Sequence, residues 1–464
     1  MLLKSALFYI ALPILQAVAA WQVPAEYAIT PSSNGRFLQD SDAKPFFWQA
    51  DTAWLLFHRL NFSEAETYLS DRAGKGFTMV LAVGFTQAGI DSPNRNGDLP
   101  FINDDVTKPN EAYWAYVDSI VELAWSKDIR ICMVPAWGKY VHGSDNSGST
   151  LVGDTNPYWQ NKTAVKADYT NGGAPTTYEV TDWSPVYDDL ANGIVAGERE
   201  AIAATSAQNA TTWSPLMSIH PTNQWFTGGP LALAHAFFGN RTWLTLDASQ
   251  SGHADYPLNP PIPWWNCRRG WEPVELMYNN GNSSEAFWNA SDVRIGSWQA
   301  VFSGAAGLTY GANAIQQCII PGLFDSDGSG PSENWLEDLV LPGSSQMQWI
   351  KKVIMDRGNT TYFSRVPAQD IIVGNVGTDD TRVTATRDSG GDWIMVYTPT
   401  GEPFQIETKS LISCDVEASW YDPLSGAYSQ FSYTQCGESV TVKTFTPPTT
   451  SGHADWVLVL DAIH

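Results

Sequence analysis

The stretch PFFWQADT, residues 45–52, introduces the pattern from which the fold is predicted. It is an apolar run that ends in the polar pair Asp51-Thr52. The motif Ser63-x-x-Glu66 that follows is typical of a capping box, and Gly74 favours the end of the helix that this box opens. The next run, residues 78–85, is apolar throughout, as expected of a strand buried on both faces. Strand, helix and strand in this order indicate a βα unit.

The same alternation continues along most of the chain. Apolar runs that end in polar residues recur at 129–137, 151–154, 215–220, 243–247 and 308–313, and helical patterns lie at 111–127, 186–204, 291–304 and 347–357. Seven strands are counted in this way, whereas a closed barrel needs an eighth between residues 247 and 292, where residues 273–278 favour a helix turn. The predicted fold class is α/β: a (β/α)8 TIM-like barrel, either complete or one strand short.

Both ends of the chain differ from this pattern. The first twenty residues combine Lys4, the apolar run 6–15 and small residues up to Ala20, which is typical of a secretory signal peptide. After the last helix, segments 383–386, 393–398, 419–421 and 456–460 are short, β-rich and separated by turn residues, which indicates an all-β sandwich. The predicted domains are therefore a signal peptide at 1–20, a barrel at 21–364 and a sandwich at 365–464.

Composition narrows the class of partner. The net charge of -23 would repel nucleic acid and anionic membranes, and no apolar run is long enough to span a bilayer. Seven N-x-S/T sequons, at Asn61, Asn161, Asn209, Asn240, Asn282, Asn289 and Asn359, agree with a secreted, extracellular glycoprotein. The 21 tryptophans favour a sugar-binding cleft, in which indole faces pack on the C–H faces of sugar rings, although they could also be core.

Several other chemistries lack their minimum residues. There is no H-E-x-x-H, G-x-S-x-G or P-loop motif and no C-x-x-C pair, so no cofactor and no metal site are predicted. Of the five cysteines, Cys414 and Cys436 flank a strand-turn-strand pattern and are the disulfide candidate, the alternative being two buried thiols. The odd count leaves at least one thiol outside a disulfide, and the apolar-flanked Cys132 is the expected one.

In a βα barrel, the reactive groups project from the carboxyl ends of the strands. The polar or aromatic residues that follow the apolar runs are therefore the site candidates: Asp51, Trp137, Asp154, His220, Asp247, Gln250, His253, Tyr310 and Asn313. Hydrolysis of a glycosidic bond needs two carboxyl groups, and Asp51, Asp154 and Asp247 could share one rim. An Asp after a strand also commonly caps the next helix, and a lone His is commonly structural, so both alternatives stay open.

Longer motifs resemble a family of apiosidase-like glycoside hydrolases that pair a barrel with a collagen-binding-like C-terminal domain. In the barrel they are Trp48-Gln-Ala-Asp51-Thr-Ala-Trp54, Phe57-His-Arg-Leu60, Tyr68-Leu-Ser-Asp71-Arg-Ala-Gly-Lys-Gly-Phe77, Pro135-Ala-Trp-Gly138, Asp247-Ala-Ser-Gln-Ser-Gly-His253, the segment 292–307 and Thr309-Tyr-Gly-Ala-Asn313. In the C-terminal domain they are Arg365-Val-Pro-Ala-Gln-Asp370, Tyr397-Thr-Pro-Thr-Gly401, Trp420-Tyr-Asp-Pro423 and Asp455-Trp-Val-Leu-Val-Leu460. The first two motifs add Trp54 and His58 to the predicted substrate-binding residues.

The resemblance implies a general acid/base and a nucleophile. Asp154 matches the family's acid/base, an Asp after a Gly-Gly pair on strand four, although here the pair is Val152-Gly153. The nucleophile would be a Glu on strand seven in a motif resembling Leu-Glu-x-x-Tyr-Glu, which was not identified; Glu275 and Glu285 are the nearest carboxylates and neither is assigned. The stretches 140–154 and 278–292 look shortened, which either lost exons or a degenerate enzyme would explain.

The leading hypothesis is a secreted glycosidase that acts on O-glycosidic bonds of plant cell-wall or related polysaccharides by a two-carboxylate mechanism. Its partner is a polysaccharide or oligosaccharide, with no nucleic acid and no membrane. The alternative is a non-catalytic carbohydrate- or matrix-binding protein. Turnover on a glycan panel, or binding without turnover, distinguishes the two.

Overall fold

The computed structural model describes most of the chain: residues 29–85, 92–136, 163–167, 178–182, 184–205, 215–219, 231–233, 238, 241–251, 270–271, 278–279, 282–283, 289–325, 334–433, 442–448 and 455–464. The chain forms two compact units. One consists of Met1–Phe46, Trp54–Leu69 and Leu81–Gln250, and the other of Phe47–Ala53, Ser70–Val80 and Ser251–His464.

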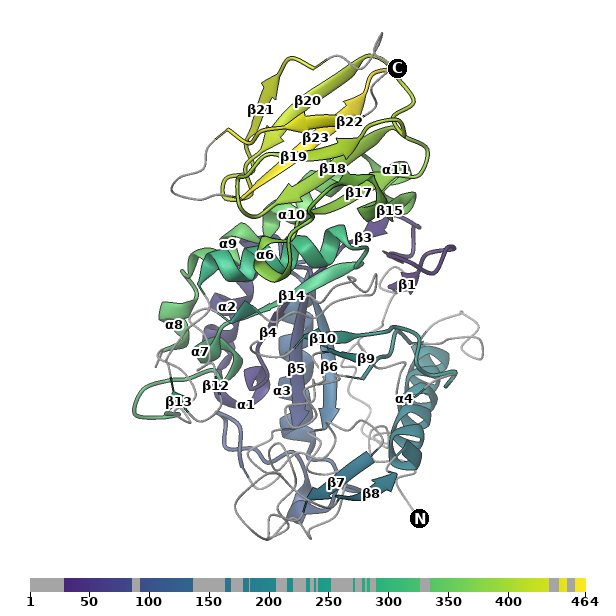
Figure 1. Ribbon diagram of the computed structural model, residues 1–464. Coiled ribbons are helices and arrows are strands. Elements are labelled where there is room, and N and C mark those ends of the chain that lie inside the picture. The colour runs from purple at the N-terminus through teal and green to yellow at the C-terminus, as the bar shows by residue number, and fades with distance from the viewer. Residues whose placement is uncertain are drawn as a thin grey trace. The chain divides into compact units, whose positions relative to one another are not determined.

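The barrel region contains a sheet of five strands in the order β11-β14-β4-β5-β6. Figure 1 labels four of them, β14, β4, β5 and β6. The strands are β11 (Gly270–Trp271), β14 (Gly307–Gly311), β4 (Trp48–Thr52), β5 (Met79–Phe85) and β6 (Arg130–Ala136). Strand β14 pairs in parallel with β11 and with β4. Gly307 allows the close approach of β14 to β4, since a Cβ there would lie 2.0 Å from the carbonyl oxygen of Trp48.

Strand β11 supplies a strand in the region where the sequence pattern lacked one. It lies between residues 247 and 292, where the sequence pattern was one strand short, and its two residues pair with Tyr310 and Gly311. Residues 272–277, most of the expected helix turn, lie outside the described residues, and Tyr278 belongs to a strand instead. Two residues are too few to show periodicity, which is why the sequence pattern missed this strand.

In the first unit, helices follow the strands as expected. They are α1 (Leu56–Arg59), α2 (Phe62–Gly74), whose first eight residues belong to this unit, α3 (Glu111–Trp125) and α4 (Ser184–Thr205). The capping box of α2 is a correction to the prediction: Asn61 Oδ1 accepts from the Glu64 backbone N–H, and Glu64 Oε2 accepts from that of Asn61. The box lies two residues before Ser63, and the predicted end at Gly74 is confirmed.

Two predicted strands of this unit contact each other but are not strands. The carbonyl of Met217 accepts from the backbone N–H groups of Thr245 and Leu246, both at 3.0 Å, so residues 215–219 and 243–247 lie side by side. The short strands elsewhere in the chain are β1 (Thr30–Pro31), β2 (Leu38–Gln39), β3 (Pro45–Phe46), β7 (Thr163–Ala167), β8 (Tyr178–Asp182), β9 (Leu231–Leu233), β10 (Ser249–Ser251), β12 (Tyr278–Asn279) and β13 (Asn282–Ser283).

The C-terminal region consists of two antiparallel sheets, as predicted (Figure 1, green to yellow). One has the order β15 (Arg365–Pro367), β17 (Thr384–Asp388), β18 (Trp393–Thr398), β23 (Trp456–Ala462), β20 (Val416–Tyr421) and β21 (Tyr428–Phe431). The other has the order β16 (Ile372–Val373), β19 (Phe404–Glu407) and β22 (Val442–Phe445). Alternate residues such as Ile394, Val396 and Leu458 fill the core between them.

The α-helices described in the second unit, besides the end of α2, are α6 (Ala290–Phe302), α7 (Asn313–Gln316), α8 (Trp335–Asp338), α9 (Pro342–Gln346), α10 (Gln348–Met355) and α11 (Asn359–Phe363). Of these, α6 packs on β17 and β18, and the carbonyl of Trp349 in α10 accepts from the Tyr421 hydroxyl of β20. The Trp298 ring of α6 stacks on Tyr397 of β18 at 5.6 Å and 9°. Arg294 of α6 forms a buried ion pair with Asp455, and Arg365 donates to two carbonyls at the end of α6. The sandwich and α6 therefore share one buried interface.

Candidate active site

The carboxyl ends of β4 and β14 lie next to each other in the second unit. Thr52 Oγ1 donates to the carbonyl of Tyr310 at 3.1 Å, and near the strand starts Trp48 Nε1 donates to Thr309 Oγ1 at 3.2 Å. All of these side chains are buried. Side chains that follow Thr52 and Gly311 thus start from one edge of the sheet, the edge at which βα barrels carry their chemistry.

Asp51, which the sequence placed among the substrate-binding candidates, is engaged in a buried ion pair. Its Oδ2 lies 2.5 Å from Arg72 Nε, neither side chain is exposed, and its Oδ1 accepts from the Thr52 backbone N–H at 2.8 Å. The guanidinium of Arg72 lies over the rings of Phe77 and Tyr310, at 5.4 and 5.9 Å from their centroids. This geometry favours a scaffold role for Asp51, since a substrate hydroxyl has no access to its oxygens.

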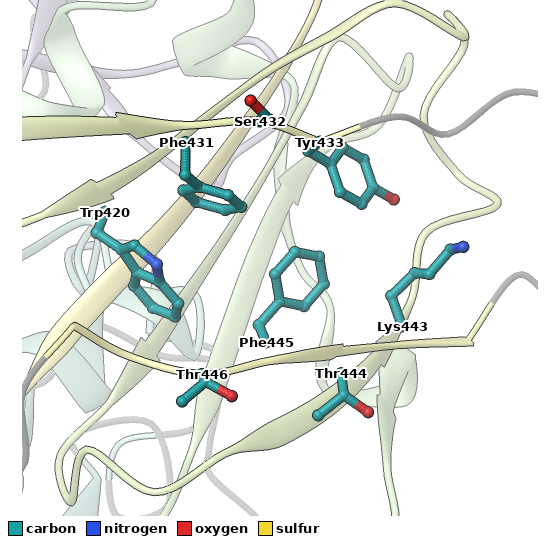
Figure 2. A pocket seen from close by; sticks show the side chains of 8 residues that line it. All are labelled: Trp420, Phe431, Ser432, Tyr433, Lys443, Thr444, Phe445 and Thr446. Atoms are coloured by element: carbon teal, nitrogen blue, oxygen red, sulfur yellow. The ribbon is translucent and has the colours of Figure 1, made fainter.

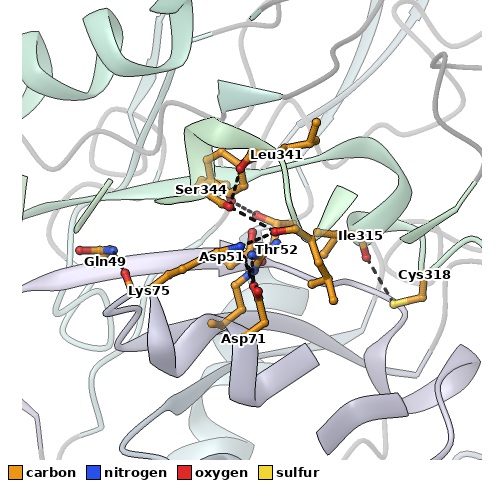
Figure 3. A network of polar contacts seen from close by, with 12 residues as sticks. Gln49, Asp51, Thr52, Asp71, Lys75, Ile315, Cys318, Leu341 and Ser344 are labelled. Atoms are coloured by element: carbon orange, nitrogen blue, oxygen red, sulfur yellow. Dashed lines mark hydrogen bonds and ion pairs between the residues drawn. The ribbon is translucent and has the colours of Figure 1, made fainter. Parts of the chain in front are cut away.

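The ion pair extends into a balanced network of charges (Figure 3). Arg72 Nη1 donates to Asp71 Oδ1 at 2.6 Å, and Lys75 Nζ donates to Asp71 and to the carbonyl of Leu339. Burial lowers the pKa of Lys75, and its hydrogen bond to Asp71 opposes that shift. Two carboxylates and two cations therefore link the end of α2 to β4 and to Leu339, the residue that follows α8.

Asn313 is a buried predicted site residue whose amide has a hydrogen-bond donor without a partner among the described residues. It begins α7 directly after β14 and is 1 % exposed. Its Oδ1 accepts from Gln317 Nε2 at 3.0 Å, which fixes the amide, while its Nδ2 has no hydrogen-bond partner in the part of the chain that the structure describes. The next backbone N–H, that of Ala314, donates to Asp338. A buried donor without a partner is costly unless a ligand or water satisfies it.

The end of β11 reaches the same edge. In the parallel register Trp271 lies opposite Gly311, two residues before Asn313. The chain continues after Trp271 with Glu272, Pro273, Val274 and Glu275, all of which lie outside the described residues. Sequence reasoning passed over Glu272 because no strand was expected before it. The signal that could have found it is a Glu-Pro step directly after a short Gly-Trp pair.

Trp54, His58 and Asp247 belong to the first unit. The Trp54 carbonyl accepts from the Val83 backbone N–H at 3.0 Å, and its side chain is half-buried. His58 is 5 % exposed, and burial, with a smaller contribution from the charge of Arg59, lowers its pKa to about 4. It is therefore neutral at pH 7. Asp247 is half-buried, two residues after the contact of Thr245 with Met217.

The remaining predicted residues are not placed. Trp137, Asp154, His220, His253 and Cys436 lie outside the described residues, as does the side chain of Gln250. Cys414 is disulfide-bonded, so one half of the predicted pair is confirmed and its partner stays a prediction. Cys132 and Cys318 are outside any disulfide, as expected for the former. In the described ranges, no three His, Cys, Asp or Glu side chains are grouped to hold a metal, and no helix is both long and apolar enough to cross a membrane.

Comparison with known proteins assigns the chain to a family. The family described as "Apiosidase-like, catalytic domain" matches residues 32–361. The chain belongs to the apiosidase-like family. The predictions of that family and of a glycosidase are thereby confirmed. A second family, "Putative collagen-binding domain of a collagenase", matches residues 366–461, and the predicted boundary at 364 lies between the two matches. No curated protein sequence matches this apiosidase-like chain.

Solved structures agree on the fold. A glycoside hydrolase family 5 protein from Bacteroides vulgatus is similar over 96 % of this chain and 95 % of its own, with a TM-score of 0.70 and 24 % identity. A second structure, described as a glycoside hydrolase, is similar over 96 % of this chain and 98 % of its own, with a TM-score of 0.67 and 23 % identity. Together with the parallel sheet, these similarities confirm the TIM-like barrel followed by a sandwich.

Proposed function

We propose that this apiosidase-like protein is a secreted, retaining glycosidase in which Glu272 supplies the nucleophile and Asp154 the general acid/base. The observation that carries the proposal is the parallel pairing of β11 with β14, which brings Trp271 opposite Gly311. The described part of β11 thus ends opposite the end of β14, two residues before Asn313, and Glu272 is the next residue in the sequence. We assign β11 as strand seven because it is the neighbour of β14 on the side away from β4, and the family resemblance implies a nucleophilic Glu on that strand.

The two carboxyl groups divide the reaction into two displacements. In the first, a Glu272 oxygen bonds to the anomeric carbon while the bond from that carbon to the leaving oxygen breaks, and that oxygen takes the proton of Asp154. In the second, water attacks the anomeric carbon, Asp154 takes back a proton, and the bond to Glu272 breaks. Two inversions give a product sugar with the configuration of the substrate.

Asn313 supports this chemistry from the neighbouring strand. Gln317 holds its amide so that the Nδ2 hydrogens are available as donors. A substrate hydroxyl or the carboxylate of Glu272 would satisfy that donor. A hydroxyl contact that strengthens as charge develops on the sugar would stabilise the transition state.

The substrate class and location rest on composition. Twenty-one tryptophans suit a chain that grips sugar rings, and polysaccharides of the plant cell wall or related glycans are the expected substrates. The signal-peptide pattern and the sequons support secretion with glycosylation. Two of the sequon residues, Asn289 and Asn359, are exposed, as a glycan acceptor must be.

The test is hydrolysis of aryl glycosides and pectic oligosaccharides by the full chain. We expect turnover of at least one substrate, with retention of configuration in the ¹H NMR spectrum of the first product. Asp154→Asn should lower kcat/KM about 10² to 10⁴-fold, least for aryl glycosides whose leaving groups need no proton. Glycan binding with no turnover on the whole panel would reject the proposal in favour of a non-catalytic carbohydrate-binding protein, and inversion of configuration would reject the nucleophile.

A further inference from the structure

The edge of the sandwich has a cavity of about 430 Å³ whose polar neighbours are already engaged (Figure 2). Its ring-bearing lining consists of Trp420, Phe431, Tyr433 and Phe445. The Tyr433 hydroxyl donates to Thr408 at 3.3 Å. The Thr444 hydroxyl accepts from Gln405 at 3.0 Å. The chemistry of this cavity therefore does not point to one ligand, whereas a polar atom that remains available lies elsewhere in the second unit, at Asn289.

Asn289 directly precedes α6 and is the N-cap residue of that helix, with an extended backbone (φ -103°, ψ 177°). Its Oδ1 accepts from the backbone N–H groups of Ser291 and Asp292, at 2.7 and 3.4 Å. The Asp292 carboxylate accepts in return from the Asn289 backbone N–H at 2.8 Å, which completes a capping box. The side-chain oxygen of Asn289 is therefore held at the start of the helix.

The capping box also decides which way the Asn289 amide faces. Two backbone donors lie against Oδ1, and an amide NH₂ in its place would set donors against donors. Nδ2 therefore faces away from these two N–H groups, and it makes no hydrogen bond to any residue that the structure describes. Because Asn289 is exposed, this nitrogen belongs to a surface side chain.

The same residue begins the sequon Asn289-Ala290-Ser291, the acceptor pattern for N-linked glycans. Transfer uses the amide nitrogen. Nδ2 bonds to C1 of the first sugar of a lipid-linked oligosaccharide, the bond from C1 to the lipid pyrophosphate breaks, and one Nδ2 proton leaves with the pyrophosphate. Because Oδ1 takes no part in the new bond, the helix cap and the glycan use different atoms of one amide.

Two other sequons in the described part of the chain each lack one of these features. Asn61 also combines a sequon with a capping box, that of α2, but it is half-buried. Asn359 is exposed, but it is the first residue of α11, whose N-cap is Gly358. Of these three residues, Asn289 is the one that is both exposed and fixed by a cap.

We propose that Asn289 carries an N-linked oligosaccharide while its Oδ1 continues to cap α6. The proposal rests on secretion, which belongs to the proposed function, because N-glycans are added in the secretory pathway. It adds a modification site that the hydrolysis of a glycosidic bond does not require. The cap fixes the attachment point to the helix that carries Arg294, the partner of Asp455 in the buried junction with the sandwich.

The experiment expresses the full chain in yeast, once with its own first twenty residues and once behind a leader peptide of the host. Peptide-N-glycosidase F in H₂¹⁸O converts each glycosylated Asn to an ¹⁸O-labelled Asp, which peptide mass spectrometry locates. We expect the label at Asn289 with both leaders. An unlabelled Asn289 behind the host leader would overturn this proposal. A label there, with no export by the chain's own leader, would reject secretion and leave the modification site standing.

Ala290→Pro is the matched variant, because it removes the sequon and keeps the cap. Proline blocks the acceptor pattern, suits the first position of a helix and agrees with the extended backbone of Asn289. We expect the mobility of a protein with one glycan fewer and a Tm within about 2 °C of the parent. Asn289→Ala removes glycan and cap together, and its Tm should be about 2 to 4 °C below that of Ala290→Pro.

Two results with these variants would overturn the proposal. One is unchanged mobility of the Ala290→Pro protein, which would mean that the parent carries no glycan at Asn289. The other is an equal Tm for Ala290→Pro and Asn289→Ala, which would mean that Asn289 does not cap α6. If the proline variant does not fold, Asn289→Asp gives the same comparison, since it keeps a capping oxygen and cannot be glycosylated.

Discussion

Two buried aspartate–arginine pairs stabilise this protein, and they are built differently. Asp51 and Arg72 are 21 residues apart, on β4 and the α2 that follows, and Arg72 shares its charge between Asp51 and Asp71. Arg294 and Asp455 are 161 residues apart; Nε and Nη2 donate to the two oxygens of Asp455 at 2.5 and 2.8 Å, and Nη1 donates to Gln346. The first pair is local to one βα unit, whereas the second forms only when α6 meets the sandwich.

The two pairs differ in the number of counter-ions that remain when one partner is removed. A guanidinium with two carboxylates keeps a counter-ion when one is removed, but Asp455 has Arg294 as its cation within the described contacts of the junction, with Tyr397 as a further donor. Removing one member of a buried pair leaves an uncompensated charge, which costs more than the pair itself contributes. The two pairs should therefore respond differently to the same type of substitution.

The largest effect is expected from Arg294→Met. Because Asp455 stays buried without its cation, the free energy of unfolding should fall by about 3 to 5 kcal/mol in chemical denaturation. The double variant Arg294→Met/Asp455→Leu removes both charges and should recover most of that loss. A double variant as unstable as the single one would show that packing, and not charge, governs the junction.

A smaller loss, about 2 to 3 kcal/mol, is expected from Asp51→Asn, because Arg72 keeps Asp71 as a partner. If Asp51 is scaffold, kcat/KM per folded molecule should change little below the lowered Tm. Matched thermal melts and rates separate the two roles. A variant with the parent's Tm and a strongly raised KM would instead return Asp51 to the substrate-binding residues.

His58 is a buried base, and its contribution to stability depends on pH. Its pKa is lowered from 6.5 to about 4, so the folded state binds fewer protons than the unfolded state between these values. Its contribution to stability is present above pH 6.5 and is lost as the pH falls toward 4, with about 2 kcal/mol lost between pH 7 and pH 5. His58→Gln should flatten this part of the curve of unfolding free energy against pH. An unchanged slope would contradict the assignment.

The smallest effect is expected at Arg382. This side chain is 5 % exposed, Nε and Nη1 lack hydrogen-bond partners among the described residues, and burial lowers its pKa. Arg382→Met should stabilise the protein by up to about 1 kcal/mol, the opposite sign to Arg294→Met, because no buried carboxylate is abandoned. A loss comparable to that of Arg294→Met would reveal a counter-charge at this position.

Periodicity predicted the elements that are long enough to show it. The runs at 78–85, 129–137 and 308–313, the helices at 111–127 and 291–304 and the β-rich C-terminal segments all correspond to elements of the structure. Strand β11 has two residues, between Arg269 and Glu272, so no pattern marks it. The cap of α2 was misplaced because Asn61, Ser63 and their partners three residues on both satisfy the capping rule.

The site was harder to predict than the fold. Position after a strand identified Asn313, but it could not separate that amide, which keeps a donor available, from Asp51, which is consumed by Arg72. The partner lies 21 residues away, and its reach depends on packing that spacing does not encode. Glu272 was not assigned for the same reason that β11 was missed. A residue becomes a site candidate only when the strand that precedes it is recognised, and the sequence pattern did not show β11.

The most direct test is the kcat/KM of Glu272→Gln measured beside that of Glu275→Gln, on a substrate that the parent hydrolyses. The two glutamates are three residues apart in the same segment, and only Glu272 follows β11 directly. We expect Glu272→Gln to lose at least about 10³-fold and Glu275→Gln to stay within about tenfold of the parent. The reverse order, or full activity in Glu272→Gln, would contradict the account.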